Sequence, residues 1–171
     1  VQEKILGPAG VNNIRIGGNL LSDRFSDEVK YYDYPGAPLS TTQVAPGAVM
    51  PTPRPYNRRV DMSDSYGGLI GNTIDLMRYL LALEGRRGPA LLTNATITAM
   101  TARPAPPVWP ATGNYVGTTW RYIPITGGVH WWHSGGASGT RNLLVRRVNG
   151  RSWVVLMNTR PQNEDQIITD L

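Results

Sequence analysis

The spacing of apolar and polar positions predicts few helices, and the clearest one lies near the middle of the chain. Residues Thr73–Leu83 carry apolar side chains every three or four positions, which is typical of an amphipathic helix. Thr73 is a candidate N-cap, and Asp75 falls in the first turn, where the helix dipole favours an anion. Gly85 is placed to end the helix. A shorter helix is expected over Asn94–Thr101.

Two further helical segments are predicted at the ends of the sequence. Val1–Leu6 has the character of the last turn of a helix that Gly7 and Pro8 stop, so we expect the chain to be cut from something longer. Asn163–Leu171 opens with acidic residues and predicts the start of a final helix.

The last third of the sequence predicts strands. Asn149-Gly150 lies between two of them and strongly favours a hairpin turn. The run Trp153–Met157 is continuously apolar, as expected of a central strand that is covered on both faces. The sequence therefore predicts an α+β fold, in which an antiparallel meander over about residues 115–158 packs with helices. The four predicted strands are Tyr115–Ile123, Gly128–Gly135, Gly139–Val148 and Ser152–Asn158.

Composition is that of a folded chain. The 171 residues, 40% hydrophobic and 17% charged, suffice for one domain of ordinary size or a piece of a larger one. The segment Pro35–Pro55 is rich in proline and predicts an extended, largely irregular stretch on the surface. No apolar run reaches the roughly 18 residues that a bilayer span requires, so no membrane span is expected. The absence of cysteine excludes disulfides, thiolate metal sites and a cysteine nucleophile.

Charge adds little to the functional picture. Seventeen basic and twelve acidic residues give a net charge of +5, which raises the question of nucleic-acid binding. The basic residues are scattered and no run of them exceeds two. We therefore interpret the excess as an ordinary basic surface and expect no nucleic-acid partner.

Familiar catalytic and cofactor motifs are missing. The only histidines, His130 and His133, would point to opposite faces of a strand, so no metal site is expected. The glycine-rich stretch Gly135–Gly139 has no lysine and no following helix, which excludes a phosphate-binding loop, and no cofactor is expected. Neither a G-x-S-x-G elbow nor an S-x-x-K motif is present, so these residues do not make up a complete serine hydrolase.

The stretch His133–Gly136 leaves two interpretations open. A strand that ends in two glycines exposes its backbone, and an N–H there could point at an oxyanion. The alternative is a glycine-rich strand end that forms a bulge and a turn.

Four stretches in order along the chain point to one family. Glu3–Val11 looks like a helix end followed by a P-L-G-M turn, with Ala9 and Val11 in place of leucine and methionine. Gly67–Leu76 is similar to G-G-L-x-S-T-x-x-D-L at the entry to a long helix. His133-Ser134-Gly135-Gly136, followed by Ser138-Gly139, looks like the H-x-G-G form of a K-T-G strand, and Val154–Asn158 like the apolar strand after it. Together they resemble the penicillin-recognising serine hydrolases: class C-type β-lactamases, D-Ala-D-Ala peptidases and β-lactamase-like esterases.

The resemblance implies a partial β-lactamase/transpeptidase-like domain. In this family the S-x-x-K motif and the Y-x-N or S-x-N motif precede the P-L-G-M turn, near which this sequence begins. We therefore expect residues 1–171 to be the C-terminal portion of such an enzyme, without the half that bears the nucleophile and inactive alone. The complete protein would hydrolyse amide, β-lactam or ester bonds through an acyl-enzyme. The alternative is a non-catalytic binding or scaffold module that keeps the fold.

The resemblance also implies roles for four residues. His133 takes the place of the K-T-G lysine as a catalytic cation or donor, and Gly136 would supply one catalytic oxyanion N–H. Ser134 and Gly135 would be substrate-binding residues, the first through its hydroxyl and the second by keeping the strand slim. Arg141 is interpreted as a surface arginine, with contact to a substrate carboxylate as the alternative.

The partners follow from the same resemblance. The complete protein would take a small-molecule or peptide substrate, and a periplasmic or secreted location would fit the family, although this chain has no targeting segment. A half-domain would expose apolar surface, so we also expect self-association or limited solubility.

Trp131 and Trp132 should point to opposite faces of their strand. One is therefore expected in the core, and the other is a candidate for cleft lining.

Overall fold

The computed structural model describes residues 1–44, 51–64 and 66–162, and these form two compact units. The first unit comprises Val1–Asn13, Asn72–Ser134 and Leu143–Val155. The second comprises Ile14–Gly71, Gly135–Asn142 and the described residues from Leu156 onward. The helix predicted over Asn163–Leu171 lies outside the described residues.

The main helix of the first unit, α1, spans Thr73–Leu83 and confirms the prediction. Its N-cap is Asn72, not Thr73: the Asn72 side chain accepts a hydrogen bond from the Asp75 N–H at 2.8 Å. The prediction was wrong here because Asn72 still has extended backbone angles, whereas Thr73 is already helical. Gly85, with a φ of +68°, ends the helix as expected.

The two smaller helices of this unit also match the sequence prediction. Helix α2 spans Asn94–Thr101 and is capped by the Thr93 hydroxyl, which accepts the Thr96 N–H at 3.1 Å. Gln2–Leu6 forms the short helix η1, so the predicted N-terminal helical turn is confirmed. It is wider than an α-helix, since the Gly7 N–H reaches the carbonyl of Gln2 at 2.8 Å.

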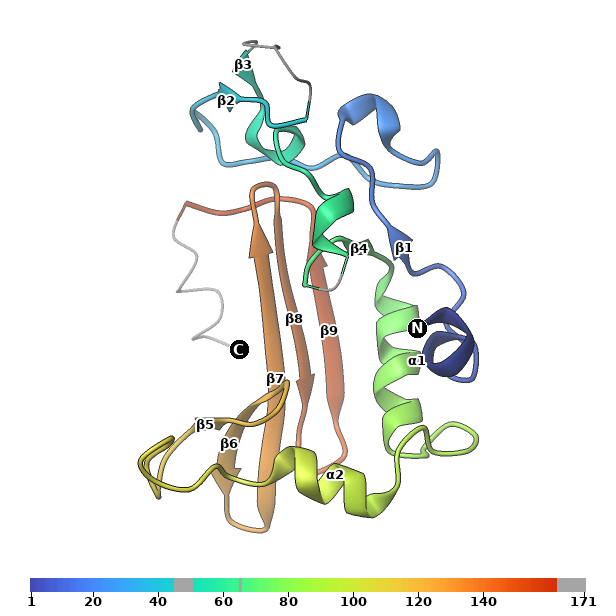
Figure 1. Cartoon of the computed structure of the whole chain (residues 1–171), viewed down its shortest axis with the longest axis vertical. Coiled ribbons are helices and arrows are strands. Elements are labelled where there is room, and N and C mark those ends of the chain that lie inside the picture. Colours follow the sequence, from blue (N-terminus) through green and yellow to red (C-terminus); the bar gives the residue numbers. More distant parts are fainter. Residues whose placement is uncertain (45–50, 65, 163–171) are drawn as a thin grey trace. The chain divides into compact units, whose positions relative to one another are not determined.

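A five-stranded sheet in the order β5-β6-β7-β8-β9 confirms the predicted meander (Figure 1). The single strand predicted over Tyr115–Ile123 is wrong, because a turn in which the Gly117 N–H bonds the Trp120 carbonyl splits it into β5 and β6. The hairpin at Asn149-Gly150 is confirmed: the Arg147 N–H bonds the Arg151 carbonyl at 2.8 Å. The strands are β5 Tyr115–Val116, β6 Arg121–Ile125, β7 Gly128–Ala137, β8 Thr140–Arg146 and β9 Ser152–Met157.

The apolar strand at the end of the meander is not central, which corrects the prediction for Trp153–Met157. Among the described strands β9 is the last in the sheet and pairs only with β8. All six of its residues are nevertheless half-buried. Apolar character on both faces was a sound guide to its burial and a poor guide to its place in the sheet.

The core of the first unit forms where α1 packs on one face of the sheet. Leu80 and Leu83 of α1 meet the aromatic side chains of Tyr122 and Trp131. The rings of Tyr122 and Trp131 pack edge to face, with centroids 6.2 Å apart. This aromatic core holds the middle of β7 in place, close to the residues singled out from the sequence.

The second unit consists largely of loops tied by short strand pairs and helical turns. Two antiparallel pairs join distant segments: β1 with β4, and β2 with β3. At the turn before β4 a Cβ on Gly68 would lie 2.6 Å from the Val60 carbonyl oxygen, so close packing requires this glycine. Within the described residues, every helix is too short or too polar to traverse a bilayer. The elements are β1 Arg15–Ile16, η2 Leu21–Asp23, β2 Ser40–Thr41, β3 Pro51–Thr52, η3 Arg54–Tyr56, η4 Asp61–Ser63 and β4 Leu69–Ile70.

Candidate functional site

The four residues singled out from the sequence are consecutive on strand β7. Its extended backbone continues to Ala137, two residues further than expected, so His133, Ser134, Gly135 and Gly136 all lie within the strand. The interpretation as a bulged strand end therefore does not hold at these four positions. The imidazole of His133 and the backbone of Gly136 are exposed, while Ser134 and Gly135 are half-buried.

Strand alternation determines which of these residues share a face. His133 and Gly135 lie on the face of Trp131, whose side chain is only 5% exposed in the aromatic core. Ser134 and Gly136 lie on the opposite face with Trp132, which is half-buried and has the Arg121 guanidinium 5.2 Å from its ring centre. Trp131 is thus the core tryptophan expected from the sequence, and Trp132 is covered by a cation.

The second histidine has a structural role. His130 lies on the face opposite His133, and its Nδ1 accepts a hydrogen bond from the Val148 N–H at 3.2 Å. Burial, together with the nearby charges of Arg147 and Arg146, lowers the pKa of His130 below its ordinary 6.5. A neutral imidazole is the form that can accept this bond. Among the described residues, no three acidic or histidine side chains come together as metal ligands would.

Arg141 has a more specific position than its interpretation as a surface arginine suggested. It is half-buried on β8, and its guanidinium lies across the backbone of Gly136. A Cβ on Gly136 would meet the Arg141 guanidinium nitrogen at 2.6 Å. The Arg141 side chain thus occupies the space that a side chain at position 136 would fill.

A loop of the second unit covers the turn that joins β7 to β8. Gly139, with a φ of +81°, lies so close to the loop that a Cβ there would be 2.6 Å from Pro55 and 2.9 Å from the Cβ of Tyr31. The Tyr56 hydroxyl accepts a hydrogen bond from the Tyr31 N–H at 2.8 Å, which holds the loop segments around Tyr31 and Tyr56 together. Pro55 and Tyr56 are buried, so the segment Pro35–Pro55, predicted to lie on the surface, reaches the interior at its end.

Polar contacts fix the same turn. The Arg54 guanidinium lies 3.2 Å from the Asp33 carboxylate and 3.5 Å from the Ser138 hydroxyl. The Asp33 side chain is only 7% exposed, so the ion pair is largely shielded from water. Sequence reasoning did not identify Arg54, Asp33 or Pro55; the only signal was an Arg-Pro-Tyr cluster at the end of an otherwise irregular stretch.

The four positions form a short run of polar and small residues along one strand. An exposed imidazole, a half-buried hydroxyl and two glycines follow one another along an extended strand. An imidazole can donate a hydrogen bond or carry a charge, and a slim strand lets another chain approach its backbone.

Comparisons with known proteins agree with this architecture. Residues 1–170 match the family model described as Beta-lactamase. No curated protein matches the sequence. An octameric penicillin-binding protein homologue from Pyrococcus abyssi shares the fold with a TM-score of 0.60 and 21% identity, over 97% of this chain and 34% of its own.

A second solved structure is similar to the same extent. It is a D-amino acid amidase from Ochrobactrum anthropi SV3, complexed with L-phenylalanine amide, with a TM-score of 0.60 and 14% identity. The match covers 96% of this chain and 44% of the amidase, so the present chain spans less than half the length of these two structures. With the family match over nearly every residue, the chain belongs to the Beta-lactamase family.

Proposed function

We propose that the chain is part of a serine hydrolase of the β-lactamase type, acting on amide, β-lactam or ester bonds. The complete protein would form an acyl-enzyme on a serine and hydrolyse it with water. The observation that carries the proposal is the His133–Gly136 tetrad, extended within β7 of a chain whose residues 1–170 match the family. A D-amino acid amidase among the structures of the same fold supports amide chemistry.

Each residue of the tetrad has a role that suits its environment. His133 is exposed, so its imidazole is free to bind a substrate carboxylate or to exchange a proton with the nucleophile. The Ser134 hydroxyl would donate to substrate, and Gly135 would let the substrate lie against the strand. The Gly136 N–H would stabilise the oxyanion, an interaction typically worth about 2.7–4 kcal/mol in the transition state.

The 171-residue chain alone should be inactive, because its sequence has no S-x-x-K motif. The proposal is tested by expressing the protein encoded by the complete genomic reading frame that contains this sequence. A fluorescent penicillin reports acylation, while nitrocefin, a p-nitrophenyl ester and D-phenylalanine amide report turnover. We expect the complete protein to be labelled on a serine and the isolated chain to remain unlabelled.

Variants at one position separate catalysis from folding. His133→Ala should lower acylation by roughly a hundredfold or more, and His133→Lys should recover part of it. His130→Gln is the control, since that histidine points to the other face of β7 and its replacement should leave acylation unchanged at neutral pH. Robust turnover by the isolated chain, abolished by His133→Ala, would contradict the proposal. A reading frame without S-x-x-K and Y-x-N would instead favour the non-catalytic binding or scaffold module.

A further inference from the structure

Although the basic residues are scattered along the sequence, several of them gather in space at one end of the first unit. Two follow α1, and the others flank the turn of the β8–β9 hairpin. The Arg86 guanidinium joins the two groups, since it donates a hydrogen bond to the Gly150 carbonyl in that turn at 3.1 Å. This basic patch comprises Arg86, Arg87, Arg146, Arg147 and Arg151.

Within the described residues, a single carboxylate pairs with the patch. Glu84, at the end of α1, lies 3.1 Å from the Arg86 guanidinium and also pairs with Arg146, and its side chain is only 10% exposed. The side chains of the other three arginines are exposed, and none of them makes a hydrogen bond or ion pair with another described residue. Those three are therefore available to an anion that comes from outside.

The stability of the fold does not account for this arrangement. Arg147 and Arg151 lie opposite each other across the hairpin, where the Arg147 N–H bonds the Arg151 carbonyl at 2.8 Å. Like charges in a cross-strand pair destabilise a sheet. The helix dipole favours cations at the end of α1, which explains Arg86 and Arg87 but not the pair on the hairpin. An external anion would relieve the repulsion between that pair.

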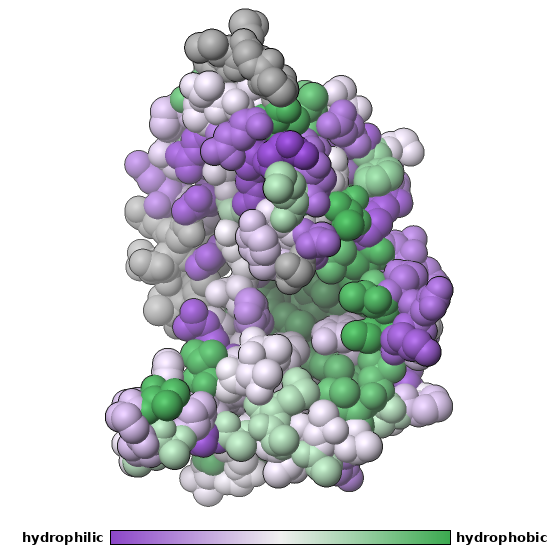
Figure 2. All heavy atoms as spheres, viewed as in Figure 1, coloured by the Kyte–Doolittle hydropathy of each residue, from purple (hydrophilic) through white to green (hydrophobic). Residues whose placement is uncertain are grey.

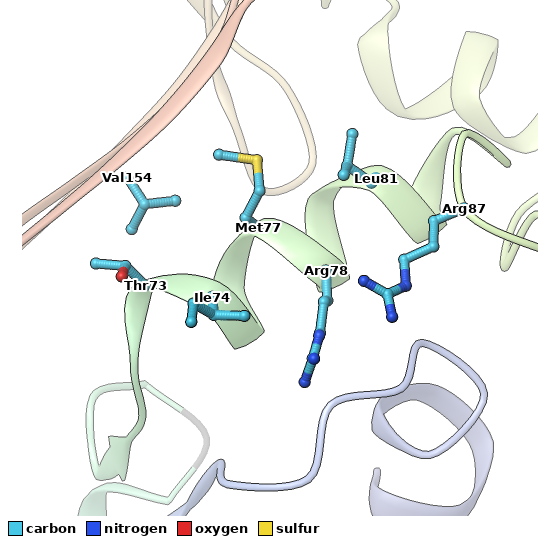
Figure 3. A pocket seen from close by; sticks show the side chains of 7 residues that line it. All are labelled: Thr73, Ile74, Met77, Arg78, Leu81, Arg87 and Val154. Atoms are coloured by element: carbon cyan, nitrogen blue, oxygen red, sulfur yellow. The ribbon is translucent and has the colours of Figure 1, made fainter.

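The patch borders an apolar groove along α1. Arg87 lies on the rim of this groove near the C-terminal end of the helix (Figure 3). The other arginine on the rim, Arg78, already pairs with Asp75 at 3.0 Å. Figure 2 shows apolar surface gathered over α1 and in the hollow beside it, so the available positive charge begins at Arg87 and extends toward the hairpin. The groove is lined by Ile74, Met77 and Leu81 of α1 and by Val154 of β9.

The available arginines do not converge on one pocket. The Arg146 guanidinium lies over the Trp131 ring, 4.9 Å from its centre, on the face of the sheet that α1 covers. By strand alternation the Arg147 side chain lies on the opposite face, and Arg151 lies there with it. Arg87 follows α1 on the first face. Positive charge therefore surrounds the end of the hairpin, which suits an extended anionic surface better than a small molecule.

The composition of this end favours lipid over nucleic acid. The loop that continues from Arg87 exposes the small apolar residues Pro89 and Ala90, and cations beside apolar side chains suit the interface of a bilayer. Neither that loop nor the hairpin turn, Arg147–Arg151, contains an aromatic residue on which a base could stack. Asn149 alone, among the residues of the turn between the two arginines, has a side chain suited to a base edge.

We propose that this end of the first unit rests on the surface of an anionic phospholipid bilayer, with the exposed arginines of the basic patch among the lipid phosphates. The contact is peripheral and electrostatic, and each arginine near such a surface strengthens binding by roughly fivefold. The proposal does not depend on the catalytic role of β7.

Sedimentation with lipid vesicles tests the choice of partner. The chain should bind vesicles of equimolar phosphatidylcholine and phosphatidylglycerol at low salt, and high salt should release it because the charges are then screened. Vesicles of phosphatidylcholine alone should not bind it. Failure to bind the anionic vesicles at low salt, or equal binding to both kinds of vesicle, would overturn the proposal.

A pair of double variants tests the position of the contact. Arg147→Gln with Arg151→Gln should weaken binding to the anionic vesicles roughly tenfold or more. The melting temperature should not fall, because a repulsive pair is removed. The matched control is Lys4→Gln with Lys30→Gln, which removes two exposed charges outside the patch. Equal weakening by the two double variants would show that net charge alone drives binding and would contradict the proposal.

A fluorescent label locates the contact, since the chain has no cysteine of its own. Pro89→Cys, labelled with an environment-sensitive dye, should shift its emission to the blue on anionic vesicles. The same label at Thr112→Cys, on the exposed loop after α2, should not shift. The reverse pattern, or equal shifts, would overturn the proposal.

A competition experiment separates lipid from nucleic acid. A short DNA duplex, added at the same phosphate concentration as the accessible lipid, should leave the chain on the anionic vesicles. Displacement by the duplex would identify nucleic acid as the preferred polyanion and overturn the proposal.

Discussion

The most informative single substitution in this chain is Asp75→Asn at the start of α1. The Asp75 side chain is completely buried, yet it is charged and lies three residues after the N-cap Asn72. Its carboxylate accepts the Asn13 N–H at 2.9 Å and pairs with the Arg78 guanidinium at 3.0 Å. Arg78 also donates to the Gly10 carbonyl at 3.3 Å. Asp75 thus fastens the N-terminal segment to the helix within the first unit.

The size of the effect follows from these contacts. Burial alone would raise the pKa of Asp75, but the Asn13 N–H and the Arg78 guanidinium stabilise the carboxylate more, so its pKa lies below the ordinary 3.8. The neutral amide of Asp75→Asn loses one charge-assisted hydrogen bond and the favourable dipole interaction at N3. Together these are worth about 2–4 kcal/mol, a large part of the stability of a small domain.

The assay is urea unfolding, followed by tryptophan fluorescence, as a function of pH. Because the folded-state pKa of Asp75 is depressed, its contribution is present above the ordinary value of 3.8 and is lost as the pH falls through the folded pKa. Asp75→Asn should therefore lower the free energy of unfolding at pH 7 and flatten its decline in acid. The matched control is Asp61→Asn, which removes an ion pair to Arg59 of 2.7 Å that is exposed on both sides. Equal decreases in the free energy of unfolding for Asp75→Asn and Asp61→Asn would refute the reasoning, since burial of the ion pair would then add nothing to its contribution.

Two further predictions concern the hairpins. The pKa of His130 is lowered, so the unfolded chain takes up a proton more readily than the folded one, and the free energy of unfolding should fall as the pH drops below about 6.5. His130→Gln should remove this pH dependence, whereas the variant of the exposed histidine, His133→Gln, should keep it. Equal pH dependence in the two variants would count against His130 as its source. Gly139→Ala should destabilise by about 1–3 kcal/mol more than Gly113→Ala. Both glycines have φ near +80° (+81° and +79°), but only Gly139 has the covering loop within reach of a Cβ, so equal losses in a thermal melt would rule out the packing argument.

Local signals in the sequence determined much of the fold. Helix α1 falls on the predicted residues because amphipathic spacing, a polar cap and a terminal glycine all agree there. Helix α2 falls on its predicted residues between the Thr93 cap and Pro104. The hairpin at Asn149-Gly150 was equally predictable, since Gly150 takes a φ of +83° that other residues rarely adopt. The turn at Gly117 was missed because no strong turn pair marks it.

Less of the candidate site was predictable, because its contacts join segments that are distant along the chain. Extended placement of His133–Gly136 followed from composition, but the position of Arg141 across Gly136 follows from strand pairing. The contact between Arg54 and Ser138 joins residues 84 positions apart, and no periodicity in an irregular loop predicts it. The packing of Pro55 on Gly139 is of the same kind.

Strand β9 shows how a pattern can be correct about burial and wrong about neighbours. A strand with apolar side chains on both faces tends to be buried on both faces, and at a sheet edge its outer backbone groups also need partners. In the described residues β9 has half-buried side chains, an apolar groove at one side and outward N–H and C=O groups at Ser152 and Val154. Water can satisfy those groups, but it leaves the apolar surface of Ile74 and Val154 exposed at a cost of roughly 25 cal/mol for each Å². The apolar pattern of β9 is therefore a guide to burial on both faces and not to the number of strands that flank it.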